Sequence, residues 1–128
     1  MKLSELKNRK EVLADHLADR SFRERWEKTA LARAVALRLV SYRAEHEISQ
    51  TELAKILGMK QPAVARLEAG EKTPTWETLG RISHGLGIEF LIDIAPKGRK
   101  TMVGSVAGRA EVVERVSSEV GNVVVAAT

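Results

Sequence analysis

The chain has 128 residues, enough for one compact domain with additions at its ends. It carries 21 Lys and Arg against 17 Asp and Glu, and the net charge of +4 favours an anionic partner. The absence of Cys excludes a disulfide framework and a thiolate zinc site, and the 4% of aromatic residues argue against an RNA-binding sheet that stacks bases. No apolar run approaches the ~18 residues of a membrane span, and the charged first residues lack the apolar core of a signal peptide, so we expect a cytoplasmic protein.

The first 57 residues contain neither Gly nor Pro and are predicted to be helical with polar breaks. A helix capped by Ser4 is followed by a longer helix from Phe22 to about Glu45, which begins with a capping box of Ser21 and Glu24. Residues 1–28 form an N-terminal helical extension with considerable apolar surface. Two interpretations remain open: packing on the protein's own core or dimer mate, and a surface for a partner protein. The candidate partner surface consists of Leu6, Leu13, Leu17, Phe22 and Trp26.

Residues 49–70 predict a helix, a tight turn and a second helix. Ser49 is a good N-cap, and Glu52 completes a capping box with it. Gly58 suits the left-handed conformation that ends a helix. The next helix begins near Pro62, because Pro is tolerated in a first helical turn.

The outer face of this second helix carries Lys60, Gln61 and Arg66. Gln pairs bidentately with adenine and Arg with guanine, while Lys reaches guanine or phosphate. The alternative is an ordinary helical hairpin with a solvated polar face. The caps, the turn glycine and the outer-face chemistry together favour a helix that enters the DNA major groove.

The segment resembles the helix-turn-helix of the Cro/repressor (Xre) family. Within this family the chain resembles the HigA-type antitoxins in its small size, the missing sensor domain, the helical N-terminal extension and the stretch over residues 85–94. The family pattern runs Ser/Thr-Gln-x-x-Leu-Ala, then a turn Gly, then Gln-x-x-Val-x-Arg-Leu-Glu-x-Gly, and the resemblance covers roughly residues 30–92. It implies an all-α domain of five helices within residues 29–95, dimeric on palindromic operator DNA and associated with the nucleoid. The matching residues are Ser49, Gln50, Leu53, Ala54, Gly58, Gln61, Val64, Arg66, Leu67, Glu68 and Gly70.

The resemblance also assigns roles to single residues. Gln50 would contact phosphate and brace Gln61, whereas Gln61 and Arg66 would read bases. Pro62 and Ala63 stand where relatives often place polar base readers, which leaves apolar contact with thymine methyl groups. The expected DNA-binding residues are Gln50, Lys60, Gln61, Pro62, Ala63, Arg66, Lys72 and Thr73, of which Lys60 contacts base or phosphate and Lys72 and Thr73 contact phosphate.

The resemblance further suggests an ion pair between Arg43 and Glu68. If the pair is buried, it fixes the recognition helix more than it adds net stability. The alternative is two unrelated surface charges.

The residues after the recognition helix predict one more helix and a strand. Thr75 caps a helix in which Trp76 and Leu79 pack inward. The alternation that follows predicts a half-buried strand, which would pair with the same strand of a second subunit; the alternative is a fifth helix. The expected dimer strand consists of Ile88, Phe90, Ile92 and Ile94.

Residues 96–128 are predicted to be a basic linker and a flexible tail. Val112, Val116 and Val120 fit a helical stripe, whereas residues 122–126 read as a strand.

No motif for catalysis, cofactor or metal binding occurs, and the three His are far apart, so we predict no enzyme, cofactor or metal site. The leading hypothesis is a repressor that acts as a HigA-type antitoxin, binds a HigB-like toxin and regulates its own operon. The alternative is a free-standing Xre-family regulator without a toxin partner. An adaptor that reuses the fold without binding DNA is disfavoured by the outer-face Gln61 and Arg66.

Overall fold

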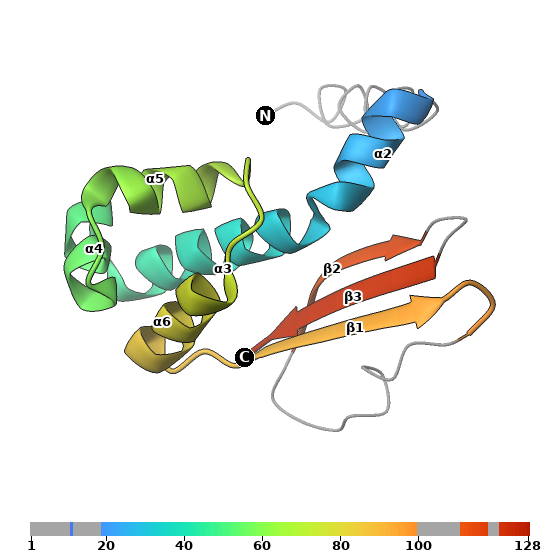
Figure 1. Cartoon of the computed structure of the whole chain (residues 1–128). Helices are drawn as coiled ribbons and strands as arrows, with labels where there is room; N and C mark the ends of the chain where they lie inside the picture. The colour runs from blue at the N-terminus through green and yellow to red at the C-terminus, as the bar shows by residue number, and fades with distance from the viewer. Residues whose placement is uncertain (1–10, 12–18, 100–110, 118–120) are drawn as a thin grey trace.

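The computed structural model describes residues 11, 19–99, 111–117 and 121–128 of the chain. In this part, five helices precede a small antiparallel sheet (Figure 1). The predicted all-α fold is therefore wrong in the C-terminal third. The elements are α2 (Arg20–Lys28), α3 (Ala30–His46), α4 (Gln50–Leu57), α5 (Gln61–Ala69), α6 (Trp76–Leu86), β1 (Phe90–Pro96), β2 (Glu111–Ser117) and β3 (Gly121–Ala127).

Helix α3 is the centre of the fold and lies between the α4–α5 pair and the sheet (Figure 1). Its many small residues let neighbouring elements approach closely; a Cβ on Gly70, for example, would lie 3.6 Å from the Cβ of Ala36. Burial of aliphatic side chains supplies most of the stability of such a core. The buried cluster consists of Val35, Leu39, Leu53, Ala54, Leu57, Val64, Leu79, Ile82, Ile88 and Ala127.

The long helix predicted from Phe22 to Glu45 is divided at Thr29 into α2 and α3. The Thr29 hydroxyl donates to the carbonyl of Arg25 at 2.9 Å, a type of bond that competes with regular helix geometry. The predicted Ser21 capping box is also wrong, because the Asp19 carboxylate accepts from the Phe22 N–H at 3.0 Å. Asp19 therefore caps α2.

This cap makes a prediction about pH. The Phe22 N–H and the Ser21 hydroxyl both donate to Asp19 and lower the pKa of its carboxyl below the usual 3.8. Because the folded-state pKa is lowered, the cap stabilises α2 above that pH and is lost as the pH falls through the folded-state value. We expect an NMR titration of the Asp19 carboxyl carbon to show a midpoint below 3.8, together with a shift of the Phe22 amide. A midpoint at or above the usual value would contradict the cap.

The sheet has the order β1-β3-β2, with both pairs antiparallel. The strand predicted near residues 88–94 exists as β1, but Ile88 precedes it and is a core residue. Strand β1 pairs with β3 of its own chain, from Phe90 opposite Ala127 to Pro96 opposite Gly121. Strand β1 therefore has a partner within its own chain on one edge, and pairing with a second subunit stays a prediction for its other edge.

The Val-rich C-terminal segment supplies both remaining strands. The helical stripe predicted for it is wrong, since Val112 and Val116 lie in β2, and Val120 lies outside the described residues. The strand predicted over residues 122–126 is confirmed as β3. β-Branched residues suit a pleated surface buried between neighbours, and Val124 and Val125 are fully buried here.

Candidate DNA-binding interface

Capping and turn residues fix where helices α4 and α5 begin and end, as the sequence predicts. The Ser49 hydroxyl accepts from the Glu52 N–H at 3.1 Å and caps α4. Gly58 ends α4 in the left-handed conformation with φ of 66°, where a side chain would be strained. Helix α5 then begins at Gln61, with Pro62 in its first turn. These local signals produce a helix, a tight turn and a second helix.

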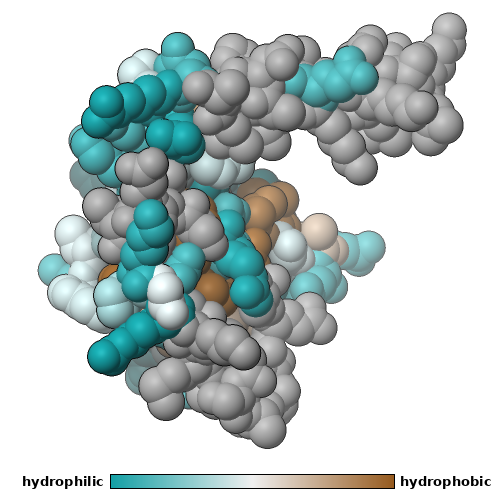
Figure 2. Space-filling view, turned by 90° about the vertical axis from the view of Figure 1, so that its right-hand side faces the viewer, coloured by the Kyte–Doolittle hydropathy of each residue, from teal (hydrophilic) through white to brown (hydrophobic). Residues whose placement is uncertain are grey.

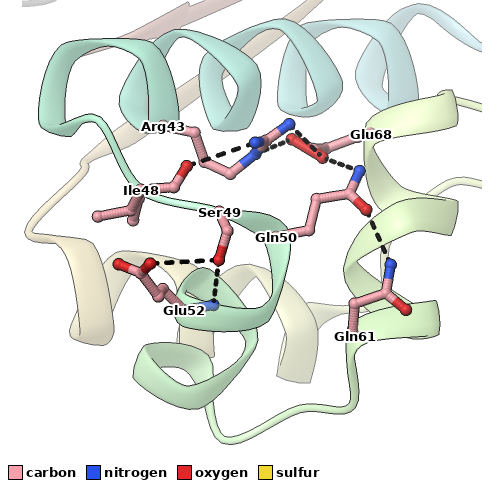
Figure 3. A network of polar contacts seen from close by, with 7 residues as sticks. All are labelled: Arg43, Ile48, Ser49, Gln50, Glu52, Gln61 and Glu68. Atoms are coloured by element: carbon pink, nitrogen blue, oxygen red, sulfur yellow. Dashed lines mark hydrogen bonds and ion pairs between the residues drawn. The ribbon is translucent and has the colours of Figure 1, made fainter.

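A polar network joins α3, α4 and α5 (Figure 3). The Arg43 guanidinium contacts both oxygens of the Glu68 carboxylate, at 2.6 and 3.2 Å. The Gln50 amide nitrogen donates to Glu68 at 2.7 Å, and the Gln61 amide nitrogen donates to Gln50 at 2.8 Å. The Glu68 side chain is 6% exposed, so its charge depends on these donors.

The chemistry of this network fixes how Gln61 is presented. An ionised carboxylate only accepts hydrogen bonds, so Gln50 must turn its NH₂ group towards Glu68 and its carbonyl oxygen towards Gln61. Gln61 then uses one N–H for Gln50 and keeps its other N–H and its oxygen for an external group. The free N–H can donate to N7 of adenine, and the oxygen can accept from the N6 amino group.

The other candidate DNA-binding residues of this region lie directly before α5 or on its outer face. Lys60, Pro62 and Arg66 are exposed and Ala63 is half-buried, whereas Val64 is fully buried on the opposite side. Neither Lys60 nor Arg66 pairs with an acidic side chain in the part of the chain that the structure describes. Two exposed cations are thus available, one directly before Gln61 and one more than a turn further along α5.

The loop between α5 and α6 exposes Lys72 and Thr73. Thr75 caps α6 by accepting from the Thr78 N–H at 3.2 Å, as predicted. The prediction that Trp76 packs inward is wrong, because this side chain is 83% exposed. Trp76 lies one helical turn before the buried Leu79 and is itself outside the core. Pro74, two residues before Trp76, is buried.

The Arg81 side chain of α6 has one partner within its own helix and one outside it. Its guanidinium donates to the carbonyl of Gly58 at 3.0 Å and pairs with Glu77 at 3.1 Å. Arg81 thus ties α6 to the turn between α4 and α5. No signal in the sequence marks this contact, because it joins residues 23 positions apart across a tertiary interface.

The other predicted surfaces lie away from this network. Leu6, Leu13 and Leu17 lie outside the described residues, whereas Phe22 and Trp26 are half-buried and stack with ring centroids 6.1 Å apart. In β1, Phe90 and Ile92 pack against the core, and Ile94 is 75% exposed.

Among the residues that the structure describes, no helix is both long and apolar enough to cross a membrane. These residues also contain no cluster of three or more acidic or His side chains suited to a metal ion.

Comparison with known proteins finds that residues 39–92, from the second half of α3 to the start of β1, match the family model described as "Helix-turn-helix". An uncharacterized HTH-type transcriptional regulator of Haemophilus influenzae is 39% identical over 54 residues, which cover 42% of this chain and 55% of the relative. Antitoxin HigA1 of Mycobacterium tuberculosis is 35% identical over 69 residues, 54% of this chain and 46% of the relative. The chain thus spans about half the length of the curated relatives it matches, and no solved structure matches it. The match to the helix-turn-helix model covers less than half of the chain, and the relatives carry the names of a regulator and an antitoxin.

Proposed function

We propose that this protein is a sequence-specific transcriptional repressor that acts as a HigA-type antitoxin, binds a HigB-like toxin and represses its own operon. The observation that carries the DNA-binding part is the presentation of Gln61 on the outer face of α5, held by Gln50, Glu68 and Arg43. The similarity to antitoxin HigA1 motivates the toxin partner. We place the protein in the cytoplasm, bound to the nucleoid.

Base recognition rests on few side chains. Gln61, oriented by Gln50, reads adenine. The exposed guanidinium of Arg66, which has no acidic partner among the described residues, reads the O6 and N7 atoms of guanine. Pro62 and Ala63 contact thymine methyl groups, and Lys60 contacts a base or a phosphate at the start of α5. Gln50, Lys72 and Thr73 contact phosphates, which fixes the position of α5 in the groove.

Replacement of Arg66 tests base recognition. Arg66→Ala is expected to cost about 1–3 kcal/mol of operator binding and to relax preference at one base position, because a bidentate contact with guanine is lost. Fluorescence anisotropy on a set of operators, each changed at one position, measures both effects.

Lys72→Ala is the matched control, since it also removes one positive charge from an exposed position. A phosphate contact carries no sequence information, so this variant should weaken binding to every sequence alike and lower the slope of log affinity against log salt by about 1. Uniform weakening by Arg66→Ala as well would contradict its role in base reading.

The proposed dimer uses the second edge of β1. The Thr128 N–H donates to the Glu89 carbonyl at 3.1 Å, so alternation along an antiparallel pair turns the backbone groups of Phe90, Ile92 and Ile94 away from β3. No strand in the described part of the chain pairs with this edge. Two copies of β1 joined antiparallel about a two-fold axis would unite two recognition helices at a spacing near one DNA turn, about 34 Å.

The toxin partner is tested by removal of residues 1–18, which precede the Asp19 cap of α2. We expect the truncated protein to keep its operator affinity and to lose co-purification with the product of the neighbouring reading frame. Collapse of the dimer on truncation would instead assign the segment a structural role. Retention of both activities would favour a free-standing regulator or a partner surface elsewhere.

A further inference from the structure

The first turn of α3 carries an arginine that contacts three parts of the chain. The Arg33 guanidinium donates to the backbone carbonyl of Trp26 in α2 and to the Thr29 hydroxyl at 2.6 Å. It also pairs with the Glu114 carboxylate of β2 at 3.1 Å. The side chains of Arg33 and Glu114 are only 16% and 15% exposed, so each charge is largely removed from water and depends on the other.

The same guanidinium positions the apolar side of α2. Its central carbon lies 3.6 Å from the centroid of the Trp26 ring, a cation–π contact, and the Phe22 ring stacks on Trp26. The outward side of α2 is charged, with Arg20, Glu24 and Arg25 exposed. Figure 2 shows hydrophilic side chains over α2, with hydrophobic surface gathered below them at the middle of the molecule.

The position of Glu114 depends on an irregularity in the sheet. Val112 pairs with Ala126 and Glu114 with Val125, so Val113 is an extra residue in β2. Val113 packs against the core, while the next side chain, Glu114, reaches Arg33. Successive side chains of a regular strand point to opposite faces, and the bulge lets both of these serve the side that faces α3.

We propose that Arg33 and Glu114 form a latch through which the C-terminal sheet holds α2 in place. The latch does not depend on the function proposed above. A partner protein that binds Phe22 or Trp26 must open it, whereas a partner on the charged outer side of α2 leaves it closed. A partner that opens the latch also loosens β2. Conversely, loss of β2 pairing weakens the contact that holds α2, because such coupling is reciprocal.

The test follows Trp26 in a Trp76→Phe background, which leaves one tryptophan in the full-length chain. Glu114→Gln removes the charge that holds Arg33. Glu45→Gln is the matched control, because Glu45 also pairs with an arginine of α3, Arg38, but at an exposed position. We expect Glu114→Gln to raise the tryptic cleavage rate within α2 about tenfold and to increase acrylamide quenching of Trp26, with the control unchanged.

Circular dichroism and thermal unfolding separate release of α2 from loss of the whole fold. Arg33→Lys keeps the positive charge but loses the fork of donors, and it should also release α2 while the main unfolding transition persists. Equal cleavage and quenching in Glu114→Gln and the control would overturn the latch. Loss of the main transition in both Arg33→Lys and Glu114→Gln would overturn it too, because the pair would then hold the entire fold.

Discussion

Arg43→Ala is expected to lower the free energy of unfolding by roughly 3–5 kcal/mol. The substitution leaves the Glu68 carboxylate, which is 6% exposed, with Gln50 as its only remaining side-chain donor among the described residues. A buried charge that loses its partner keeps its desolvation cost without compensation. Urea unfolding followed by circular dichroism measures the loss, provided that the slope against urea stays constant.

Glu77→Gln is the matched control for this experiment, since it breaks the ion pair with Arg81, whose side chains are 77% and 47% exposed, and leaves the Arg81–Gly58 hydrogen bond in place. Exposed pairs contribute about 0–1 kcal/mol, so this variant should remain near the wild-type stability. A loss below 1 kcal/mol for Arg43→Ala would mean that the Glu68 charge is not held by Arg43.

A double replacement separates stability from recognition. Arg43→Met combined with Glu68→Met removes both charges and should recover most of the lost stability, because apolar residues of similar volume often replace a buried ion pair at little cost. The operator affinity should not recover, since Gln50 no longer has a carboxylate that orients its amide and, through it, Gln61. This combination distinguishes a positioning network from a merely stabilising one.

The parts of the fold that the sequence predicts well depend on local chemistry. Ser49, Gly58 and Thr75 act within one helical turn of themselves, so the ends of α4 and the start of α6 follow from residue type. The Val-rich segment gives a weaker signal, because valines four residues apart lie on one stripe of a helix and equally on one face of a strand. Strand pairing decides between the two, because β3 pairs with β1, 25 to 37 positions earlier in the chain, and β2 pairs with β3.

The contacts of the candidate site also fall into two groups, those that a sequence motif indicates and those that it does not. The family resemblance implies the Gln50–Gln61 and Arg43–Glu68 pairings, and the structure places both within hydrogen-bond distance. The contacts of Arg81 with Gly58 and of Arg33 with Glu114 carry no comparable motif. The second of these joins residues 81 positions apart and requires a bulge in β2, which residue type alone does not reveal.

The edge of β1 gives the second large prediction. Ile94→Pro removes a backbone N–H that the proposed dimer pairing uses, at a residue whose side chain is 75% exposed and contributes little to the core. We expect the variant to be monomeric by sedimentation equilibrium. Its affinity for a full palindromic operator should fall about 10²–10⁴-fold, because the two half-sites are no longer bound by one linked unit.

Affinity for a single half-site should stay unchanged in this variant, since the exposed Ile94 is not part of the core that α5 shares with Phe90 and Ile92. Ile94→Thr is the matched control, because it keeps the N–H and a β-branched side chain and should remain dimeric. A dimer that survives Ile94→Pro would place the two-fold axis elsewhere and leave base reading by Gln61 and Arg66 intact. Loss of half-site binding in the dimeric Thr variant would instead show that the end of β1 supports the recognition helix itself.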